Sequence, residues 1–490
     1  MKTLCICLMV AISMAITSLA KAAIGKPFAP LLTRSLTDFG AVGNGVADDT
    51  DALKRALYRS DQYCLDGQNR TYRVSGTLRV TNSLCLKRAT LRQSLEPFDT
   101  SPYISRTCPV TGNPFIVTDC GDASVSDDDL VALRQSLALR TLFIKPAKRG
   151  DTPLLVTLDR VRIDRGPYPE AGSRQDAAGI WLEGAERVDF RDVEISGSGK
   201  GYGLLLIRSR NVTLVGLHIH DIVWSPYRGD TPLKWNEVSA IGWNTVPIRE
   251  FRTAGSDGAA QSKFYGVRIQ EQVTCAFLAE VTHVVIKGAR ISQCMARFDR
   301  GDMPWQTDGL DIGGSSTDIV VTGGTTIEST WEGMDVVASG DGIQGLRLDG
   351  VRVTNSFSFG LKLGYALQNV KVLRPVIKGA GLAAMVLYGP VKDATIADAK
   401  IVEVGGVTVS GSTLRPWASN TRAAILLDKG SAGTAAEGRA PNNIIIKGAS
   451  VGAINDAGSY DFGFLNLGAT NAALINEKAL GCRIAISSGF

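Results

Sequence analysis

Short apolar runs alternate with turns of Gly, Asn, Asp and Ser along the chain from about residue 152 onward. Typical segments are RVDFRDVEISGSG, NVTLVGLHIHD, HVVIKGARIS, GLRLDGVRVTNS and NVKVLRPVIKGAG, each with two β-branched runs separated by a turn. Alternating apolar and polar positions predict strands, and helical periodicity is nearly absent in this region. The self-similarity of the segments indicates a repeat architecture.

The repeat has a measurable step. The phrase Gly-apolar-x-apolar recurs in AGIWLEG, YGLLLIR, DGLDIGG, EGMDVVA and FGLKLGY, and AAMVLYG is a copy with alanine at the anchor. The successive anchors are separated by 24, 106, 24, 27 and 24 residues, and they are Gly179, Gly203, Gly309, Gly333, Gly360 and Ala384. A β-sandwich would also have short strands but gives no reason for a fixed step. We therefore predict an all-β, single-stranded parallel β-helix, a solenoid whose coils bury their inward side chains on one another.

The stretch TDFGAVGNGVADDTDALKRAL, from Thr37 to Leu57, predicts a glycine-rich loop and then an amphipathic helix. Asp48 and Asp49 are the candidate N-caps of that helix. Its apolar stripe at helical spacing comprises Ala52, Leu53, Ala56 and Leu57. The loop lacks the Lys-Ser/Thr of a P-loop, so we interpret its glycines as structural. Because the end of a solenoid exposes apolar side chains and strand edges, we expect the helix to be an N-terminal cap.

The same stretch closely resembles the opening motif of the pectate-lyase-like superfamily, which includes polygalacturonases, rhamnogalacturonases and phage tailspike endoglycosidases. The resemblance implies a right-handed parallel β-helix that acts on or binds acidic or branched polysaccharides, by hydrolysis or by β-elimination. It covers the opening motif and the 24-residue coils, whereas residues 86–150 and those after about 400 match no part of it.

Stacking the coils by their anchors places charged residues on neighbouring rungs. The residue before the anchor is Asp308, Glu332 and Phe359 in three successive coils, and the residue two positions after it is Asp311, Asp335 and Lys362. Coils lie about 4.7–4.9 Å apart, so each set forms a ladder of side chains. Like charges on adjacent rungs are unfavourable without compensation. Two interpretations remain: a solvated polar ladder, or acids held at split pKa values in a sugar groove.

The ladders support two chemistries. Glycoside hydrolysis needs an acid and a base or nucleophile, and we assign Asp308 and Glu332 to these parts. Elimination at a uronate needs a base and a cation, for which Lys362 is the candidate base, with Asp311 and Asp335 as candidate Ca²⁺ ligands. We expect no cofactor for a hydrolase, and Ca²⁺ only for a lyase.

The segment QTDGLD, Gln306–Asp311, resembles the N-T-D-G-x-D motif of polygalacturonase-type hydrolases, which implies a catalytic Asp308. Glu332 stands level with the family's second acid, but Trp331 replaces the acid before it. The family's later Gly-His-Gly and Arg-x-Lys are replaced by SFG and MVLYG. These departures leave three interpretations: a hydrolase of another polysaccharide, our first choice; a polysaccharide lyase; and a non-catalytic polysaccharide-binding or export protein.

The insertion ARFDRGDMPWQ precedes the acidic motif and predicts one wall of a substrate groove. Arg297 and Arg300 are candidates for gripping uronate carboxylates, and Trp305 and Trp331 for stacking on sugar rings. The chain has only three histidines and no Cys/His cluster, so we expect no histidine-rich metal site. His218 and His220 share one strand face, and we assign them no catalytic role.

The first 22 residues predict a secretory signal, with Lys2 as the positive end, an apolar run at Leu4–Ile16, and Ala20-Lys21-Ala22 as the cleavage site. We therefore expect a secreted or periplasmic mature chain without a membrane span. A formal charge of +5 with interspersed signs gives no indication of a nucleic-acid partner. The sequence does not indicate an oligomeric state.

Seven cysteines follow the signal, and an oxidising compartment permits disulfides among them. Neighbours in sequence suggest three bonds and one unpaired residue, namely Cys64–Cys85, Cys108–Cys120, Cys275–Cys294 and free Cys482. The predicted organisation is a signal at 1–22, a cap and first coils at 23–150, and the remaining coils with a C-terminal cap at 151–490. The second region contains an inserted helical segment, Asp127–Arg140.

Overall fold

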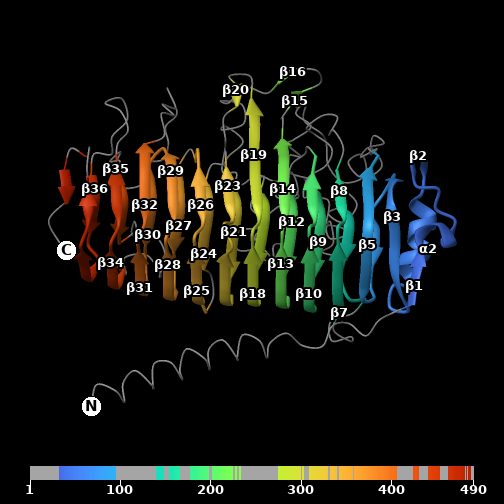
Figure 1. Ribbon diagram of the computed structural model, residues 1–490, viewed down its shortest axis with the longest axis horizontal. Helices are drawn as coiled ribbons and strands as arrows, with labels where there is room; N and C mark the ends of the chain where they lie inside the picture. The colour runs from blue at the N-terminus through green and yellow to red at the C-terminus, as the bar shows by residue number, and fades with distance from the viewer. Residues whose placement is uncertain are drawn as a thin grey trace, which may run out of the picture.

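A computed structural model gives the fold of the protein. It describes residues 32–94, 140–147, 154–165, 177–197, 201–224, 227–228, 231–232, 274–298, 301–302, 308–328, 332–338, 341–356, 358–404, 423–429, 440–452, 462–479, 482 and 484–486. In Figure 1 the strands stack side by side along the long axis, from the N-terminal end in blue to the C-terminal end in red. The predicted signal, Cys108, Cys120 and residues 127–139 of the predicted helical segment lie outside the described residues. Its last residue, Arg140, is not helical but begins β6 (Arg140–Ile144).

Each regular coil contributes three strands. One coil holds β9 (Ala177–Glu183), β10 (Ala185–Arg191) and β11 (Glu194–Ser196), and the next holds β12 (Gly201–Ile207), β13 (Arg210–Val215) and β14 (His218–Trp224). Each strand of the first coil pairs in parallel with its counterpart in the second. This confirms the predicted parallel β-helix, the fold implied by the resemblance to the pectate-lyase-like superfamily.

Within the described residues, two sheets run the length of the solenoid. The first, the narrow sheet, has 12 strands: β4 (Leu78–Val80), β6 (Arg140–Ile144), β9, β12, β17 (Thr274–Ala279), β21 (Asp308–Gly314), β24 (Glu332–Ala338), β27 (Phe359–Gly364), β30 (Ala383–Tyr388), β33 (Ala423–Asp428), β36 (Phe462–Leu467) and β39 (Ile484–Ile486). The second, the broad sheet, has 25 strands, most of which form two parallel ladders that join where β3 (Tyr63–Val74) and β5 (Leu84–Gln93) run through both. The exception is β20 (Gly301–Asp302), which pairs antiparallel with β19 (Arg290–Phe298).

The strands of the broad sheet are β1 (Leu32–Ser35), β2 (Asn44–Asp48), β3 (Tyr63–Val74), β5 (Leu84–Gln93), β7 (Leu154–Asp159), β8 (Arg162–Asp164), β10, β11, β13, β14, β18 (Thr282–Lys287), β19 (Arg290–Phe298), β20 (Gly301–Asp302), β22 (Thr317–Thr322), β23 (Thr326–Glu328), β25 (Ile343–Asp349), β26 (Arg352–Thr354), β28 (Leu367–Leu373), β29 (Val376–Ala380), β31 (Val391–Ala397), β32 (Lys400–Val404), β34 (Asn442–Lys447), β35 (Ser450–Gly452), β37 (Thr470–Ile475) and β38 (Lys478–Ala479). A separate hairpin pairs β15 (Tyr227–Arg228) with β16 (Thr231–Pro232).

The anchor glycines mark positions where neighbouring coils approach closely. A Cβ on Gly333 would lie 2.3 Å from Val353 and 2.6 Å from the carbonyl oxygen of Gly360, so no side chain fits there. The 106-residue gap between anchors contains a further coil with β17, in which Cys275 lies opposite Gly203. The repeat search missed this coil because a cysteine occupies its anchor position.

A short helix lies at the N-terminal end of the solenoid in Figure 1, as α2 (Thr50–Tyr58), after the 3-10 turn η1 (Leu36–Phe39). Its apolar stripe is buried in the same core cluster as the inward side chains of the coils. The two predicted N-cap residues have different hydrogen-bonding roles. Asp48 accepts hydrogen bonds from the backbone and hydroxyl of Thr50, whereas Asp49 accepts from the backbone N–H groups of Val42 and Gly43. Asp49 therefore fixes the glycine loop rather than the first turn of the helix.

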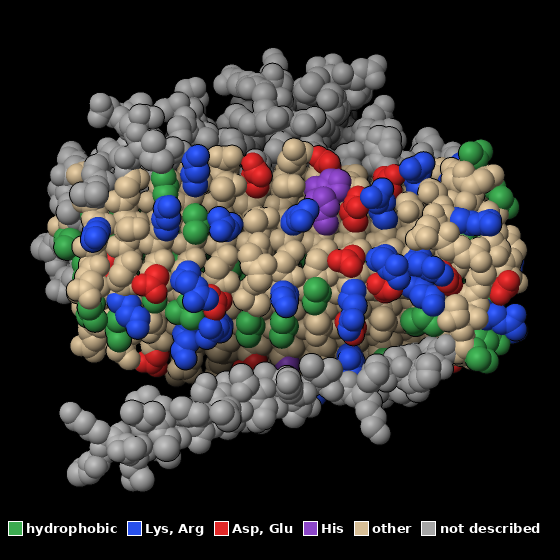
Figure 2. Space-filling view, in the orientation of Figure 1, with side chains coloured by type: hydrophobic (Ala, Val, Ile, Leu, Met, Phe, Trp, Pro, Cys, Tyr) green, Lys and Arg blue, Asp and Glu red, His purple; other side chains and the backbone are tan. Residues whose placement is uncertain are grey.

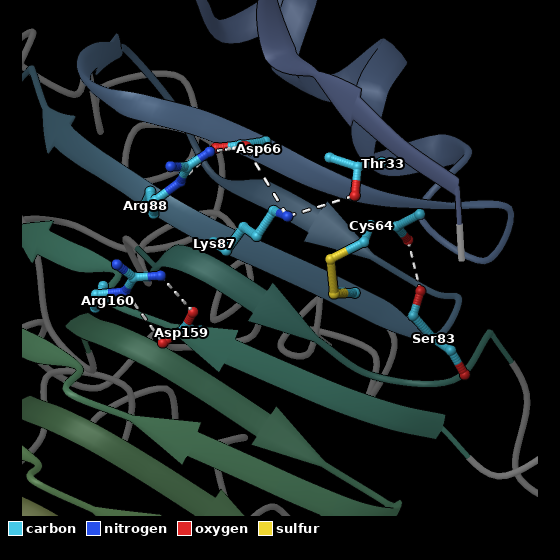
Figure 3. Close-up of a disulfide and its surroundings, with 10 residues drawn as sticks. Thr33, Cys64, Asp66, Ser83, Lys87, Arg88, Asp159 and Arg160 are labelled. Atoms are coloured by element: carbon cyan, nitrogen blue, oxygen red, sulfur yellow. Dashed lines mark hydrogen bonds and ion pairs between the residues drawn. A yellow bond between two sulfur atoms is a disulfide. The ribbon is translucent and has the colours of Figure 1, made fainter. Parts of the chain in front are cut away.

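Two predicted disulfides are present. Cys64–Cys85 links adjacent rungs β3 and β5, and Cys275–Cys294 links β17 to β19. Figure 3 shows the first bond beside Asp66, which forms ion pairs with Lys87 and Arg88. Among the described cysteines Cys482 is free, as predicted.

In the part of the chain that the structure describes, no helix has both the length and the apolar character needed to cross a membrane.

Candidate active site

The charged ladders lie on three adjacent strands of the narrow sheet, β21, β24 and β27. Asp308 lies opposite Glu332, Asp311 lies opposite Asp335, and Asp335 in turn lies opposite Lys362. The register predicted from the anchors is therefore confirmed. Side chains alternate along a strand, and Leu310 and Leu361 point into the central core from positions next to these charged residues.

Lys362 joins the two ladders into one cluster. Its Nζ donates a hydrogen bond of 2.9 Å to Oε2 of Glu332 and another of 2.9 Å to Oδ2 of Asp335. Glu332 belongs to the first ladder and Asp335 to the second, so both ladders face the same side of the sheet. One ammonium group thus compensates the like charges on adjacent rungs.

The cluster is buried. Asp308 is 1% exposed, Glu332 is 6% exposed, and Asp335 and Lys362 are each 9% exposed. Asp311 is partly buried. The interpretation of these residues as a solvated polar ladder is therefore wrong. Because an unpaired charge is costly to bury, a carboxyl group in this place either pairs with a cation or takes up a proton.

Burial shifts the pKa of three acids upward. The pKa of Asp308 lies well above its usual range because the group is desolvated, and the charges of Asp335 and Asp311 add to the shift. Burial also raises the pKa of Asp311 and of Glu332, although Lys362 opposes the shift in both. These directions follow from the cost of ionising an acid in a low-dielectric site next to other acids.

The pKa of Lys362 is raised as well. Burial alone would lower it, but the attraction of Asp335 and Glu332 outweighs the desolvation and holds the amine as an ammonium ion. Burial is the main cause of the raised pKa of Glu332, and the charge of the neighbouring Asp335 adds to it. No donor among the described residues reaches Oδ2 of Asp308.

The carboxylates do not suit Ca²⁺. Oxygen atoms of Asp308, Glu332 and Asp335 lie within 4.8 Å of one another, which is close enough for a shared cation. However, Nζ of Lys362 already lies 2.9 Å from two of these groups. Ca²⁺ takes six to eight oxygen ligands, and an ammonium ion that already pairs with two of the three carboxyl groups repels it.

Aromatic side chains border the cluster at both ends, and the sequence interpretation missed them. Phe277 of β17 lies opposite Asp311 and stacks on Tyr202 with ring centroids 5.8 Å apart. At the other end, the ring centroid of Tyr388 is 5.8 Å from Nζ of Lys362. Burial raises the pKa of Tyr388. Extending the ladder through the phrase TCAFLA would have found Phe277. In AAMVLYG the ladder position opposite Lys362 is Val386, and Tyr388 lies two residues further along, so the ladder does not indicate it.

Of the predicted substrate-binding residues, the structure describes only one. Trp305, Trp331 and Arg300 lie outside the described residues. Arg297 belongs to β19, where its backbone pairs with that of Asp302. The two histidines, His218 and His220, lie on β14 of the broad sheet and take no part in the carboxylate cluster.

No family model matches the sequence, and no curated protein matches it. Among solved structures, the chain is similar to the A-module of the Azotobacter vinelandii mannuronan C-5 epimerase AlgE4, with 14% identity, a TM-score of 0.38, and coverage of 93% of this chain and 97% of that one. It is similar to PfbA, a surface adhesin of Streptococcus pneumoniae, with 12% identity, a TM-score of 0.41, and 93% coverage of both chains. It is also similar to DFA-IIIase from Arthrobacter chlorophenolicus A6, with 9% identity, a TM-score of 0.44, and coverage of 90% and 94%. At these identities no residue role is carried over.

Proposed function

We propose that this protein is a carbohydrate-active enzyme, a glycoside hydrolase in which Asp308 is the general acid. The observation that carries the proposal is the buried Asp308 beside a second carboxyl pair that is held by a lysine. A glycosidase needs one acid that is protonated at neutral pH and one carboxylate that is ionised. Burial raises the pKa of Asp308, whereas the ammonium group of Lys362 contacts Glu332 and Asp335 and favours a carboxylate there.

In the proposed reaction, Asp308 gives its proton to the glycosidic oxygen as the bond to the sugar breaks. The raised pKa of Asp308 keeps that proton available near neutral pH. Glu332 and Asp335, which both contact Lys362, supply the base or the nucleophile. As a base, the pair takes a proton from a water molecule whose oxygen bonds to the anomeric carbon; as a nucleophile, one carboxylate oxygen bonds to that carbon and water displaces it in a second step. Lys362 stabilises the negative charge that this pair carries.

β-Elimination with Lys362 as the base is disfavoured by the same contacts. A lysine amine must lose its proton before it can act as a base, whereas two ion pairs of 2.9 Å and a raised pKa keep Lys362 charged. A Ca²⁺-assisted lyase meets the further difficulty that the ammonium group of Lys362 already pairs with Glu332 and Asp335. We therefore expect turnover to be unaffected by a calcium chelator.

The proposed substrate is an extracellular acidic or branched polysaccharide, met after export to the periplasm or the medium. The resemblance of the opening motif and the predicted signal support this choice. Phe277, the partly exposed aromatic residue beside Asp311, suits stacking on a sugar ring at one end of the carboxylate cluster.

The test is to incubate the purified protein with a panel of acidic exopolysaccharides. We expect new reducing ends without the ultraviolet absorbance of an unsaturated uronate. The Asp308→Asn variant should lose about 10²–10⁴-fold in rate, the usual contribution of a general acid. Asp318→Asn is the matched control, since the Asp318 side chain is 63% exposed on the other sheet. Unsaturated products would indicate a lyase, and binding without products would indicate a non-catalytic protein.

A further inference from the structure

A second cluster of metal-binding side-chain types lies on the broad sheet, apart from the carboxylate cluster. β11 and β14 are adjacent rungs, on which Glu194 lies opposite His218 and Ser196 opposite His220. The two histidines are two positions apart on one strand, so they share a face, and their rings stack with centroids 4.3 Å apart. Figure 2 shows this histidine patch in purple, bordered by acidic and basic side chains.

The three residues converge on one point. One candidate ligand atom from each of Glu194, His218 and His220 lies within 4.8 Å of the other two. Nε2 of His220 is 3.3 Å from Oε1 of Glu194. In a tetrahedral Zn²⁺ site with bonds of about 2.0–2.2 Å, ligand atoms are about 3.3–3.6 Å apart. That pair already has the spacing of two zinc ligands, and a tilt of the His218 ring would bring in the third.

Neighbouring charges orient the ligand atoms. Oδ2 of Asp221 is 2.6 Å from Nδ1 of His220, and this contact turns Nε2 of the same ring toward Glu194. Arg162 donates a hydrogen bond of 2.8 Å to Oε2 of Glu194, which leaves Oε1 directed at the histidines. A carboxylate on the far nitrogen of a ligating histidine is the usual outer contact of protein zinc sites.

We propose that Glu194, His218 and His220 form a binding site for Zn²⁺ or another divalent cation that prefers imidazole ligands. Two histidines and one glutamate match the three-ligand set that leaves a fourth position for water. Glu194 and the histidines belong to successive coils, so a bound ion links the two coils. The expectation of no histidine metal site rested on the small number of histidines, and two of the three are brought together here.

The test uses tag-free protein that has been treated with a chelator and titrated with Zn²⁺ in a calorimeter. We expect one ion per chain, with affinity lowered at least ~10-fold by His218→Ala or His220→Ala, since even outer contacts contribute that much. His283→Ala is the matched control. His283 is the third histidine of the chain, 60% exposed and 3.0 Å from Asp318, and we expect its replacement to leave the affinity unchanged.

Two further measurements separate a lost site from a misfolded variant. Zn²⁺ should raise the unfolding temperature of the unmodified protein but not that of a His218→Ala/His220→Ala variant, because an ion that binds only the folded state stabilises it. Co²⁺ should give the visible absorption of a four-coordinate site in the first protein alone. Equal Zn²⁺ affinity in both proteins, or no stoichiometric binding by the unmodified protein, would overturn the proposal.

Discussion

Replacing Lys362 by methionine removes the cation that contacts Glu332 and Asp335 while it keeps a similar unbranched side chain. Each contact is 2.9 Å long, and at an effective dielectric constant of about 20 it contributes about 6 kcal/mol before desolvation is subtracted. Breaking a buried ion pair by removing one partner lowers the free energy of unfolding by about 3–5 kcal/mol. We expect a loss in that range for Lys362→Met at neutral pH.

The loss should depend on pH in a definite direction. Burial raises the folded-state pKa of Glu332 above its ordinary value, so ionisation lowers the stability of the folded protein as pH rises through this window. Lys362 limits that loss in the unmodified protein, and the variant lacks this protection. The stability difference should therefore be largest at neutral pH and shrink toward acid pH, where the carboxyl groups are protonated in both proteins.

The assay is guanidinium-induced unfolding at neutral and at acid pH, followed by circular dichroism. Lys371→Met is the matched control, because Lys371 lies on the exposed side of β28 in the broad sheet. A surface replacement of this kind changes stability by less than about 0.5 kcal/mol. If Lys362→Met unfolds like Lys371→Met at neutral pH, or if its deficit grows toward acid pH, the description of the cluster is wrong.

Three further predictions concern the cluster and the coils. Asp308→Asn should raise the unfolding temperature at neutral pH and leave it unchanged in acid, because the raised pKa of Asp308 makes ionisation destabilising; lower stability at neutral pH would contradict this. Gly333→Ala should lower the free energy of unfolding in guanidinium by about 1–3 kcal/mol, because its Cβ would lie 2.6 Å from the Gly360 oxygen. The control is Gly452→Ala, which should have no such effect, because a Cβ at Gly452 would have nothing within 4 Å. Loss of the disulfide through Cys275→Ala should lower that free energy by about 3 kcal/mol, from the closure of a loop of 19 residues; unchanged stability would argue against the bond.

The coil register was predictable because it depends on the backbone. The close approach of neighbouring coils at Gly333 excludes a side chain. Glycine therefore recurs at the anchor positions, and its regular spacing can be read from the sequence. From that step alone, Asp311, Asp335 and Lys362 could be placed on successive rungs, as the strand pairing confirms. The coil that contains β17 was not predicted, because its anchor position accepts a small side chain, that of Cys275, in place of glycine.

The contacts of the charged side chains were less predictable, because they depend on the length and the burial of each side chain. The sequence left open whether the two ladders face one groove, and the length of the Lys362 side chain decides this by bridging Glu332 and Asp335. Asp49 stood at a helix start yet bonds to the glycine loop, because the chain folds back there. The patch of His218 and His220 needed Glu194 from the preceding coil, and no local motif contains all three.

Turnover in ¹⁸O-labelled water tests the proposed hydrolysis most directly. Hydrolysis adds one water across each cleaved bond, so mass spectrometry of the products should show one ¹⁸O atom for every new reducing end. Asp308→Asn should release almost no labelled product, while Asp318→Asn should match the unmodified protein. Products that are shorter but carry no label, or full labelling by Asp308→Asn, would contradict the assignment of this carboxylate cluster as a hydrolytic site.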